Sequence, residues 1–336
     1  MKIAILGATG YTALELLHLL SRHPHSEVTV ATSRTEAGKK IAEIHPSLTG
    51  KYDLAITEPN LEQIQADAEF VFSCLPHAAS ATICKPLVEA GLRVVDFSAD
   101  YRLNELSVFE SWYKTTHPDP ERLGSVPYGL PELFREQIRD ANLVANPGCY
   151  PTSAVLALIP LLRNGLIEPD GLIIDSKSGV SGAGRSLKMT TLYSECNESF
   201  AAYALGSHRH TPEITQLLTE AAGAQAELLF TPHLVPMDRG ILTTAYATPA
   251  GPGVSEEKLY ETLENFYADE PFVQVVSDPP ATKHVTGTNR CHLTVRKIGE
   301  RVLLVSVIDN LVKGASGAAV QNFNLMCGFE ETTALL

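Results

Sequence analysis

The sequence predicts an α/β protein with a doubly wound parallel sheet in its first half and an α+β domain, with a mostly antiparallel sheet, in its second half. In the first half, short apolar strand segments alternate with helix-like segments, which is typical of parallel sheets. In the second half, strand-like segments follow one another with fewer helices between them, which favours antiparallel pairing. The length of 336 residues also exceeds that of a typical single domain.

Composition limits the classes of function. Hydrophobic residues make up 44% of the chain and charged residues 19%, as in an ordinary folded core. The net charge of −13 argues against nucleic acid or an anionic membrane as the main partner. The six cysteines are widely spread without a Cys-x-x-Cys pair, and no apolar run reaches membrane-spanning length. We therefore expect a cytoplasmic enzyme acting on a small molecule, with reduced thiols and no metal site.

The chain begins with a nucleotide-binding pattern. An apolar strand at residues 2–6 leads directly into a glycine turn at residues 7–13, and leucines then form the apolar face of a helix. Gly7 permits a tight turn, Gly10 lets the backbone approach a pyrophosphate, and Ala13 allows close helix packing. An ordinary strand-to-helix turn is the alternative interpretation. The residues of this turn predicted to contact a dinucleotide are Gly7, Thr9, Gly10, Tyr11 and Thr12.

The next strands indicate where that dinucleotide lies. The strand at residues 28–32 ends at Ser33 and Arg34, and a cation there favours NADP(H) over NAD because it suits a 2′-phosphate. Further strands are predicted at residues 70–75 and 93–97, with a helix at 78–90 between them. The end of the former strand should also reach the cofactor through Ser73, Leu75 and Pro76. Residues 100–131 are predicted to be an excursion of loops and short helices.

One cysteine occupies the position expected of a nucleophile. The strand at residues 143–145 is ended by Pro147 and Gly148, and a helix is predicted to begin just after Cys149. Unpaired N–H groups and the helix dipole favour a negative charge at such a position. A small buried hydrophobe is the alternative role for Cys149.

Two polar clusters follow in the second half. A strand predicted at residues 171–175 precedes a Gly- and Ser-rich loop at 177–185, which is suited to binding an anion. His208 and His210 bracket Arg209 just before a predicted helix start at residues 211–212. Either histidine is a candidate acid/base for the thiol, and surface histidines and a flexible solvent loop are the alternatives. Further strands are predicted at residues 228–230, 241–247, 292–295 and 302–308, and small residues open a closing helix.

Seven motifs in order resemble the N-acetyl-γ-glutamyl-phosphate reductases, relatives of the aspartate-semialdehyde dehydrogenases. The motifs occupy residues 7–12, 96–102, 128–132, 146–152, 181–185, 208–213 and 310–314. The resemblance implies an NADP-binding Rossmann domain at residues 1–148, on which a C-terminal helix at 314–330 packs. It also implies an α+β catalytic and oligomerisation domain at 149–313, and a homodimer or homotetramer.

The resemblance also implies a reaction in arginine biosynthesis. Cys149 would attack an acyl phosphate to give a thioester, NADPH would reduce it to the semialdehyde, and His208 or His210 would relay the proton. The residues expected to hold the substrate are Arg102, Asn146, Ser181, Arg185, Arg209 and Glu213. Those expected to reach the cofactor from the second half are Gly179, Gly182 and Asn310.

Three alternatives stay open at this point. A reductase of a carrier-protein-linked aminoadipyl phosphate, in lysine biosynthesis, would share every motif. A non-catalytic NADP(H) sensor would share the nucleotide-binding half, because a fold alone does not establish an activity. A thiol hydrolase or acyltransferase would need Cys149 and a histidine, but it would leave the glycine turn and Arg34 without a role.

Overall fold

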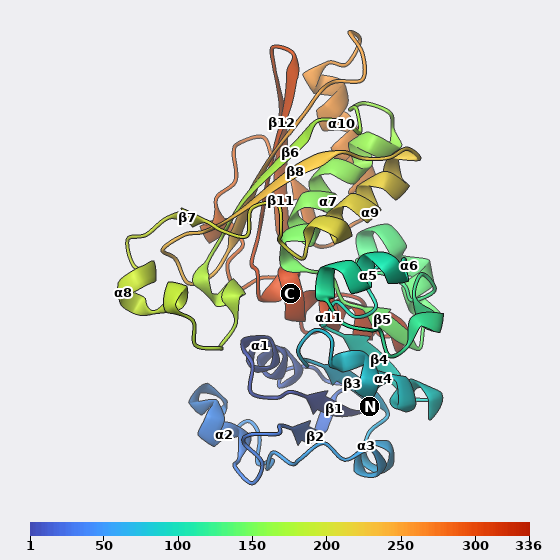
Figure 1. Cartoon of the computed structure of the whole chain (residues 1–336), viewed down its shortest axis with the longest axis vertical. Coiled ribbons are helices and arrows are strands. Elements are labelled where there is room, and N and C mark those ends of the chain that lie inside the picture. The colour runs from blue at the N-terminus through green and yellow to red at the C-terminus, as the bar shows by residue number, and fades with distance from the viewer. The chain divides into compact units, whose positions relative to one another are not determined.

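The computed structural model describes residues 1–336 and divides into two compact units (Figure 1). The first unit comprises Met1–Pro147 and Ala315–Leu336, and the second comprises Gly148–Gly314. No helix of the structure combines the length and the apolar character needed to cross a membrane. Each unit is built around one sheet.

A five-stranded sheet forms the centre of the first unit. Its strand order is β2-β1-β3-β4-β5, and every neighbouring pair is parallel, which confirms the predicted parallel sheet. The chain passes from β1 to β2 on one side and then crosses to β3 on the other side of β1, so the strand order reverses there. The carboxyl end of β1 is therefore the expected ligand-binding position. The strands are β1 (Lys2–Leu6), β2 (Glu27–Thr32), β3 (Phe70–Ser73), β4 (Arg93–Asp96) and β5 (Leu143–Ala145).

Helices cover both faces of this sheet because its strands are apolar on both sides. The closing helix α11 contacts α1, β4 and α6, and its Phe323 ring lies against Phe70 and Phe72 of β3. The predicted excursion contains helix α5, whose Phe109 and Tyr113 stack in a small separate core. The helices of this unit are α1 (Tyr11–Leu20), α2 (Ile41–Ile44), α3 (Leu61–Asp67), α4 (Ser80–Glu89), α5 (Leu106–Tyr113), α6 (Pro131–Arg139) and α11 (Gly317–Met326).

The second unit is built on a seven-stranded sheet with the order β10-β11-β12-β9-β6-β8-β7. Four of its neighbouring pairs are antiparallel, and the pairs β10–β11 and β6–β8 are parallel, so the predicted mostly antiparallel sheet is confirmed. The strands are β6 (Leu172–Ser178), β7 (Ala201–Ala202), β8 (Leu228–Leu234), β9 (Ile241–Ala247), β10 (Val273–Val275), β11 (Cys291–Ile298) and β12 (Arg301–Ile308).

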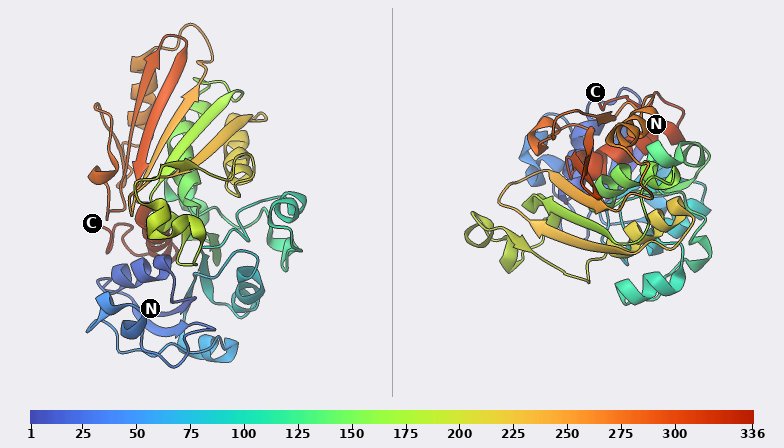
Figure 2. Two further views of the ribbon diagram at one scale, coloured as in Figure 1. Left: turned by 60° about the vertical axis from the view of Figure 1, so that its left-hand side comes forward. Right: turned by 90° about the horizontal axis from the view of Figure 1, so that it is seen from above.

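Three helices pack on one face of this sheet, α7 (Cys149–Arg163), α9 (Thr211–Ala222) and α10 (Glu256–Phe266) (Figure 2). Helix α7 is the centre of the layer, since every residue from Tyr150 to Leu162 is buried and it contacts α9, α10, β9 and β12. On the opposite face the strands β6, β8 and β9 carry partly exposed side chains at alternate positions. The start of α7 is therefore fixed by packing along the rest of the helix.

Some elements differ from the sequence prediction. Strand β6 continues to Ser178, so the predicted Gly- and Ser-rich loop begins later, and β8 continues through Pro232 to Leu234. Helix α10 was not predicted, although Ser255 caps it by accepting a hydrogen bond from the Lys258 N–H. A short π-helix at Val312–Ser316 precedes α11.

Candidate functional site

Cys149 is itself the first residue of α7, so the helix begins slightly earlier than the sequence predicts. Gly148 precedes it in an extended conformation, and no side chain caps the helix start. Within the second unit the thiol is partly exposed, unlike Cys291, which is buried in the sheet. The first turn of a helix presents N–H groups that lack partners within the helix, so an anion is favoured at this position. Cys149 is thus not fully buried, and its role as a nucleophile stays a prediction.

The start of α9 meets the start of α7 at Gly148. A Cβ atom built on Gly148 would lie 2.6 Å from Nε2 of His210, so the imidazole ring occupies the space that any other residue at position 148 would need. The buried carboxylate of Glu213 accepts a hydrogen bond of 2.9 Å from the Gly148 N–H. His210 and Glu213 therefore hold the residue that precedes the cysteine.

His208 belongs to a chain of hydrogen bonds beside His210. Its Nδ1 accepts the backbone N–H of His210 at 3.1 Å, so in the neutral ring the proton is on Nε2. Nε2 lies 3.3 Å from the Tyr203 hydroxyl, and that hydroxyl donates to the hydroxyl of Tyr150 at 3.1 Å. This series of hydrogen bonds ends at the Tyr150 hydroxyl, which donates to the carbonyl of His233 at 3.2 Å. Both ring nitrogens of His208 are thus engaged in fixed contacts.

The shifted pKa values of His208, Tyr203 and Tyr150 keep these three side chains neutral near pH 7. Burial, with a smaller contribution from the neighbouring Arg209 charge, lowers the pKa of His208 to about 4. Burial raises the pKa of Tyr203 to about 12 and moves the pKa of Tyr150 in the same direction. His208 therefore carries no positive charge under ordinary conditions, and it holds the backbone of His210 as a neutral hydrogen-bond acceptor.

This low pKa predicts a pH-dependent stability. Because the pKa of His208 is about 4 in the folded protein and 6.5 for an unperturbed histidine, the unfolded chain binds more protons between these values. The contribution of His208 to the free energy of unfolding is complete above pH 6.5 and is lost as the pH falls through 4. We expect urea denaturation to show a larger pH effect on the wild type than on His208→Asn. Between about pH 7 and 4.5, the free energy of unfolding of the wild type should fall by about 2 kcal/mol more than that of the variant. Parallel losses in the two proteins would contradict this assignment.

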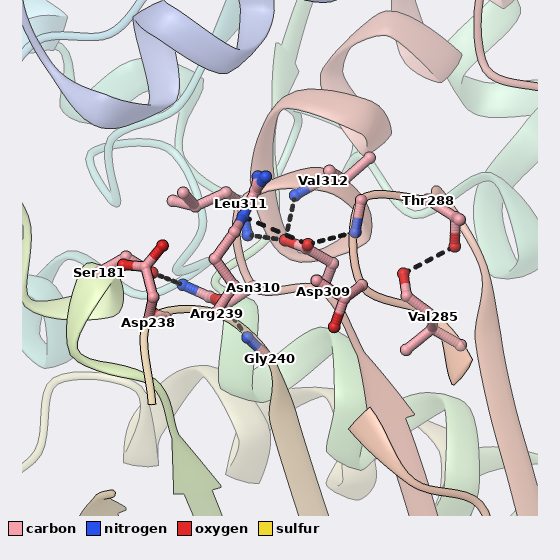
Figure 3. Close-up of polar contacts among 12 residues, drawn as sticks. Ser181, Asp238, Arg239, Gly240, Val285, Thr288, Asp309, Asn310, Leu311 and Val312 are labelled. Atoms are coloured by element: carbon pink, nitrogen blue, oxygen red, sulfur yellow. Dashed lines mark hydrogen bonds and ion pairs between the residues drawn. The ribbon is translucent and has the colours of Figure 1, made fainter. Parts of the chain in front are cut away.

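A second segment approaches the cysteine from the end of β12. A Cβ atom on Gly314 would lie 2.9 Å from Cβ of Cys149, so only glycine fits there. The buried carboxylate of Asp309 organises this segment, since it accepts the N–H groups of Leu311 and Val312 and, from another loop, that of Gly287 (Figure 3). Arg239 forms an ion pair with the same carboxylate at 3.3 Å.

Several residues predicted to contact ligands form a polar cluster between loops of the second unit (Figure 3). The Asn310 side chain accepts the Gly240 N–H at 2.7 Å and donates to the Ser181 hydroxyl at 3.0 Å, and that hydroxyl donates to the Asp238 carbonyl. Gly179 is required here because a Cβ would lie 2.4 Å from the Asp238 carbonyl oxygen. Gly182 follows in the short helix Val180–Ala183. These contacts fix the loop whose predicted task is to bind an anion.

The three predicted substrate arginines lie in different surroundings. Arg102, in the first unit, is buried and donates to the backbone carbonyls of Phe97 and Asn146 at 2.7 Å each. The Asn146 side chain in turn donates to the carbonyl of Ala315 at 3.0 Å. Arg185 and Arg209, in the second unit, are exposed. Arg102 therefore supports the loop before the cysteine, and its role as a substrate anchor stays a prediction, as do those of the other two.

The glycine turn of the first unit has the shape that a dinucleotide requires. Gly7 has φ +75°, and a Cβ there would lie 2.7 Å from the carbonyl oxygen of Cys74. A Cβ on Gly10 would meet no atom closer than the Thr12 hydroxyl at 3.9 Å, and no side chain caps the start of α1. An uncapped helix N-terminus with open space before it fits a pyrophosphate. Thr9 lies in this turn, and Tyr11 and Thr12 are the first two residues of α1.

The other cofactor residues predicted in the first unit also lie at or just after carboxyl ends of strands. Ser33 is buried after β2, while Arg34 is exposed beside it. Ser73 is the last residue of β3, and its hydroxyl is bonded to that of Ser80 at 2.6 Å inside the unit. After the strand, Leu75 is partly exposed and Pro76 is exposed. No group of three or more His, Cys, Asp or Glu side chains is arranged as metal ligands.

Sequence reasoning missed Tyr203, Asp309 and Arg239. Tyr203 stands alone in a segment without periodicity, and its partner Tyr150 is 53 residues away in the chain. Asp309 follows an apolar strand directly, and an acidic residue between two buried segments is a usable signal, because such a charge needs partners.

Comparison with known proteins agrees with the family resemblance of the sequence motifs. The NAD binding domain model of semialdehyde dehydrogenases matches residues 2–141, and their dimerisation domain model matches residues 149–310. N-acetyl-γ-glutamyl-phosphate reductases of Rhodopirellula baltica and Moorella thermoacetica are 54% and 50% identical, each over 100% of this chain and 98% of the relative. The crystal structure of Candida albicans aspartate semialdehyde dehydrogenase with NADP shares the fold, with a TM-score of 0.72 at 19% identity over 97% of this chain and 98% of the other. The chain belongs to the N-acetyl-γ-glutamyl-phosphate reductase family of semialdehyde dehydrogenases.

Proposed function

We propose that this chain reduces N-acetyl-γ-glutamyl phosphate to N-acetylglutamate 5-semialdehyde with NADPH and releases phosphate, a step of arginine biosynthesis. The observation that carries the proposal is Cys149 at the uncapped start of α7, with the His210 ring packed on the adjacent glycine. The names of relatives about half identical over the full chain support the substrate. A cytoplasmic location suits the six free cysteines.

Cys149 is the proposed nucleophile. Its sulfur attacks the acyl carbon of the substrate, the bond from that carbon to the phosphate oxygen breaks, and phosphate leaves with the electron pair. The product of this step is a thioester on Cys149, and the N–H groups at the start of α7 suit the negative charge that develops nearby. When bound, NADPH supplies the hydride that reduces the thioester.

His210 is the proposed acid/base, and His208 positions it. The low pKa and two fixed contacts of His208 make it a poor proton carrier at pH 7, whereas its Nδ1 holds the His210 backbone. His210 takes the thiol proton when Cys149 attacks, and it returns a proton when the thiol leaves the reduced intermediate. Glu213 keeps Gly148 in place throughout.

We assign cofactor binding to the first unit and the catalytic chemistry to the second. The turn at Gly7 and Gly10 would receive the pyrophosphate, and Ser33 with Arg34 would receive the 2′-phosphate that distinguishes NADPH. The exposed side chains of Arg185 and Arg209 are proposed to bind the charged groups of the substrate.

The reverse reaction tests this function most directly. Purified protein is given N-acetylglutamate semialdehyde, phosphate and NADP, and the absorbance of the reduced nicotinamide is followed. We expect phosphate-dependent reduction of NADP. Turnover only with the aminoadipate analogue would instead move the assignment to lysine biosynthesis, and binding of NADPH without turnover of either aldehyde would favour a sensor.

We also propose that two copies associate through the outer face of the seven-stranded sheet. Leu229, Ile173 and Tyr246 are paired across the neighbouring strands β8, β6 and β9, and they are 59%, 39% and 39% exposed. Such a row of large apolar side chains is suited to burial against an identical row. The family model that matches this unit is described as a dimerisation domain.

This interface predicts the effect of a single charge. We expect Leu229→Glu to lower the sedimentation coefficient from that of a dimer or larger assembly to that of a monomer, because a carboxylate would be buried without a partner. Ile298→Glu is the matched control, since Ile298 is 62% exposed at the β11–β12 hairpin and outside the row. Unchanged sedimentation of Leu229→Glu would exclude this face.

A further inference from the structure

His45 contacts the glycine turn of the first unit from a segment far from it in sequence. The residue lies between α2 and a short 3-10 helix at Pro46–Leu48, and it is only 4% exposed. Nε2 of its ring lies 2.8 Å from the carbonyl oxygen of Ala8. Because a carbonyl oxygen only accepts hydrogen bonds, Nε2 carries a hydrogen and donates it.

The segment that carries His45 is itself fixed against α1. Ile41 and Leu48 are fully buried on either side of His45. The Tyr52 hydroxyl donates to the Leu17 carbonyl at 2.7 Å, and the His18 ring is bonded to the Ser47 hydroxyl at 3.0 Å. His45 therefore approaches Ala8 from a rigid support.

The contact determines how one peptide group of the turn is oriented. The Ala8 carbonyl and the Thr9 N–H belong to the same planar trans peptide, so they point in opposite directions. When His45 holds the carbonyl, the Thr9 N–H is directed to the other side of the turn. The two preceding peptides are fixed as well, because the Gly7 and Ala8 N–H groups both donate to the Thr32 carbonyl, at 3.1 and 2.9 Å. The turn is thus held by Thr32 of β2 at two successive peptides and by His45 at the next.

We infer that His45 is a positioning residue for dinucleotide binding: its Nε2–H orients the Ala8–Thr9 peptide so that the turn is preformed for a pyrophosphate. The inference rests on the proposed binding of NADPH. Preorganisation of backbone donors lowers the cost of binding, so loss of the contact should weaken cofactor affinity and leave the chemistry at Cys149 unchanged once cofactor is saturating.

The test compares His45→Gln with His45→Asn. The glutamine Nε2 reaches the position of the imidazole Nε2, whereas the shorter asparagine amide does not, so the two polar variants differ mainly in reach. The dissociation constant of NADPH is measured by nicotinamide fluorescence, and kcat is measured with saturating NADPH. We expect His45→Asn to raise the dissociation constant about fivefold or more, while His45→Gln stays within about twofold of wild type. His25→Gln is the control, since His25 is an exposed histidine of the first unit whose ring stacks on Phe329.

The outcomes separate the inference from the function on which it rests. Equal NADPH affinity of wild type and His45→Asn overturns the role of His45, whether or not the melting temperature falls. Equal weakening by both His45 variants overturns it as well, because reach would then be irrelevant. Failure of wild-type protein to bind NADPH instead refutes the proposed cofactor, and binding with no turnover refutes the proposed reaction.

Discussion

Replacing Cys149 with serine is expected to lower kcat at least about 10³-fold in the reverse assay. A serine hydroxyl at the start of α7 keeps the size of the side chain, but it is a far weaker nucleophile near neutral pH. The N–H groups of the helix start and the turn proposed to bind the cofactor are unchanged in this variant. Its dissociation constant for NADPH, measured by fluorescence, should therefore equal that of the wild type.

Cys196→Ser provides the matched control for this result. Cys196 is also a partly exposed free cysteine of the second unit, but it lies in the short helix Tyr193–Cys196. Its replacement should leave kcat unchanged. Substantial activity in Cys149→Ser would contradict covalent catalysis, and mass spectrometry of wild type with acyl phosphate but no NADPH should detect the acylated Cys149 peptide.

Replacing His210 with glutamine is expected to lower kcat about 10²- to 10⁴-fold, the usual contribution of a general acid/base. The glutamine amide retains a hydrogen-bonding group close to the position of Nε2 beside Gly148, but it cannot take or return a proton. Single-turnover kinetics should show that both thioester formation and release of the semialdehyde become slower, since each step moves a proton to or from the sulfur.

His208→Asn distinguishes the two histidines. Asparagine places an oxygen near the position of Nδ1, so the hydrogen bond from the His210 N–H is retained while the contact to Tyr203 is lost. We expect a decrease in kcat of about tenfold or less, because the proton carrier is still present and only its support is weakened. If His208→Asn lost as much activity as His210→Gln, the acid/base assignment would have to be exchanged between them.

The parts of the structure that the sequence predicts are those set by local signals. The glycine turn after β1 and the Pro-Gly-Cys sequence before α7 each combine a strand, a turn residue and a helix within about ten residues, and the structure confirms both. Helix α10 carries a comparable signal in its Ser255 cap, and sequence reasoning nevertheless missed it.

The choice between the histidines was beyond the sequence because it depends on distant contacts. The role assigned to His208 depends on its lowered pKa and on its contact with Tyr203, and Tyr203 in turn is held by Tyr150 from another helix. His45 reaches Ala8 across 37 residues with no pattern that links the two. Such contacts arise only when the chain is folded, since no local propensity encodes them.

The close approach of His210 to Gly148 also restricts how this site can evolve. Any side chain at position 148 requires the ring at 210 to shrink or move, and a smaller residue at 210 removes the proposed proton carrier. Each single substitution is harmful, and the steric cost of one is relieved only in the presence of the other, so their effects are not additive. Lineages that retain the reaction should therefore keep both Gly148 and His210. A lineage that has lost the histidine can accept a larger residue at position 148.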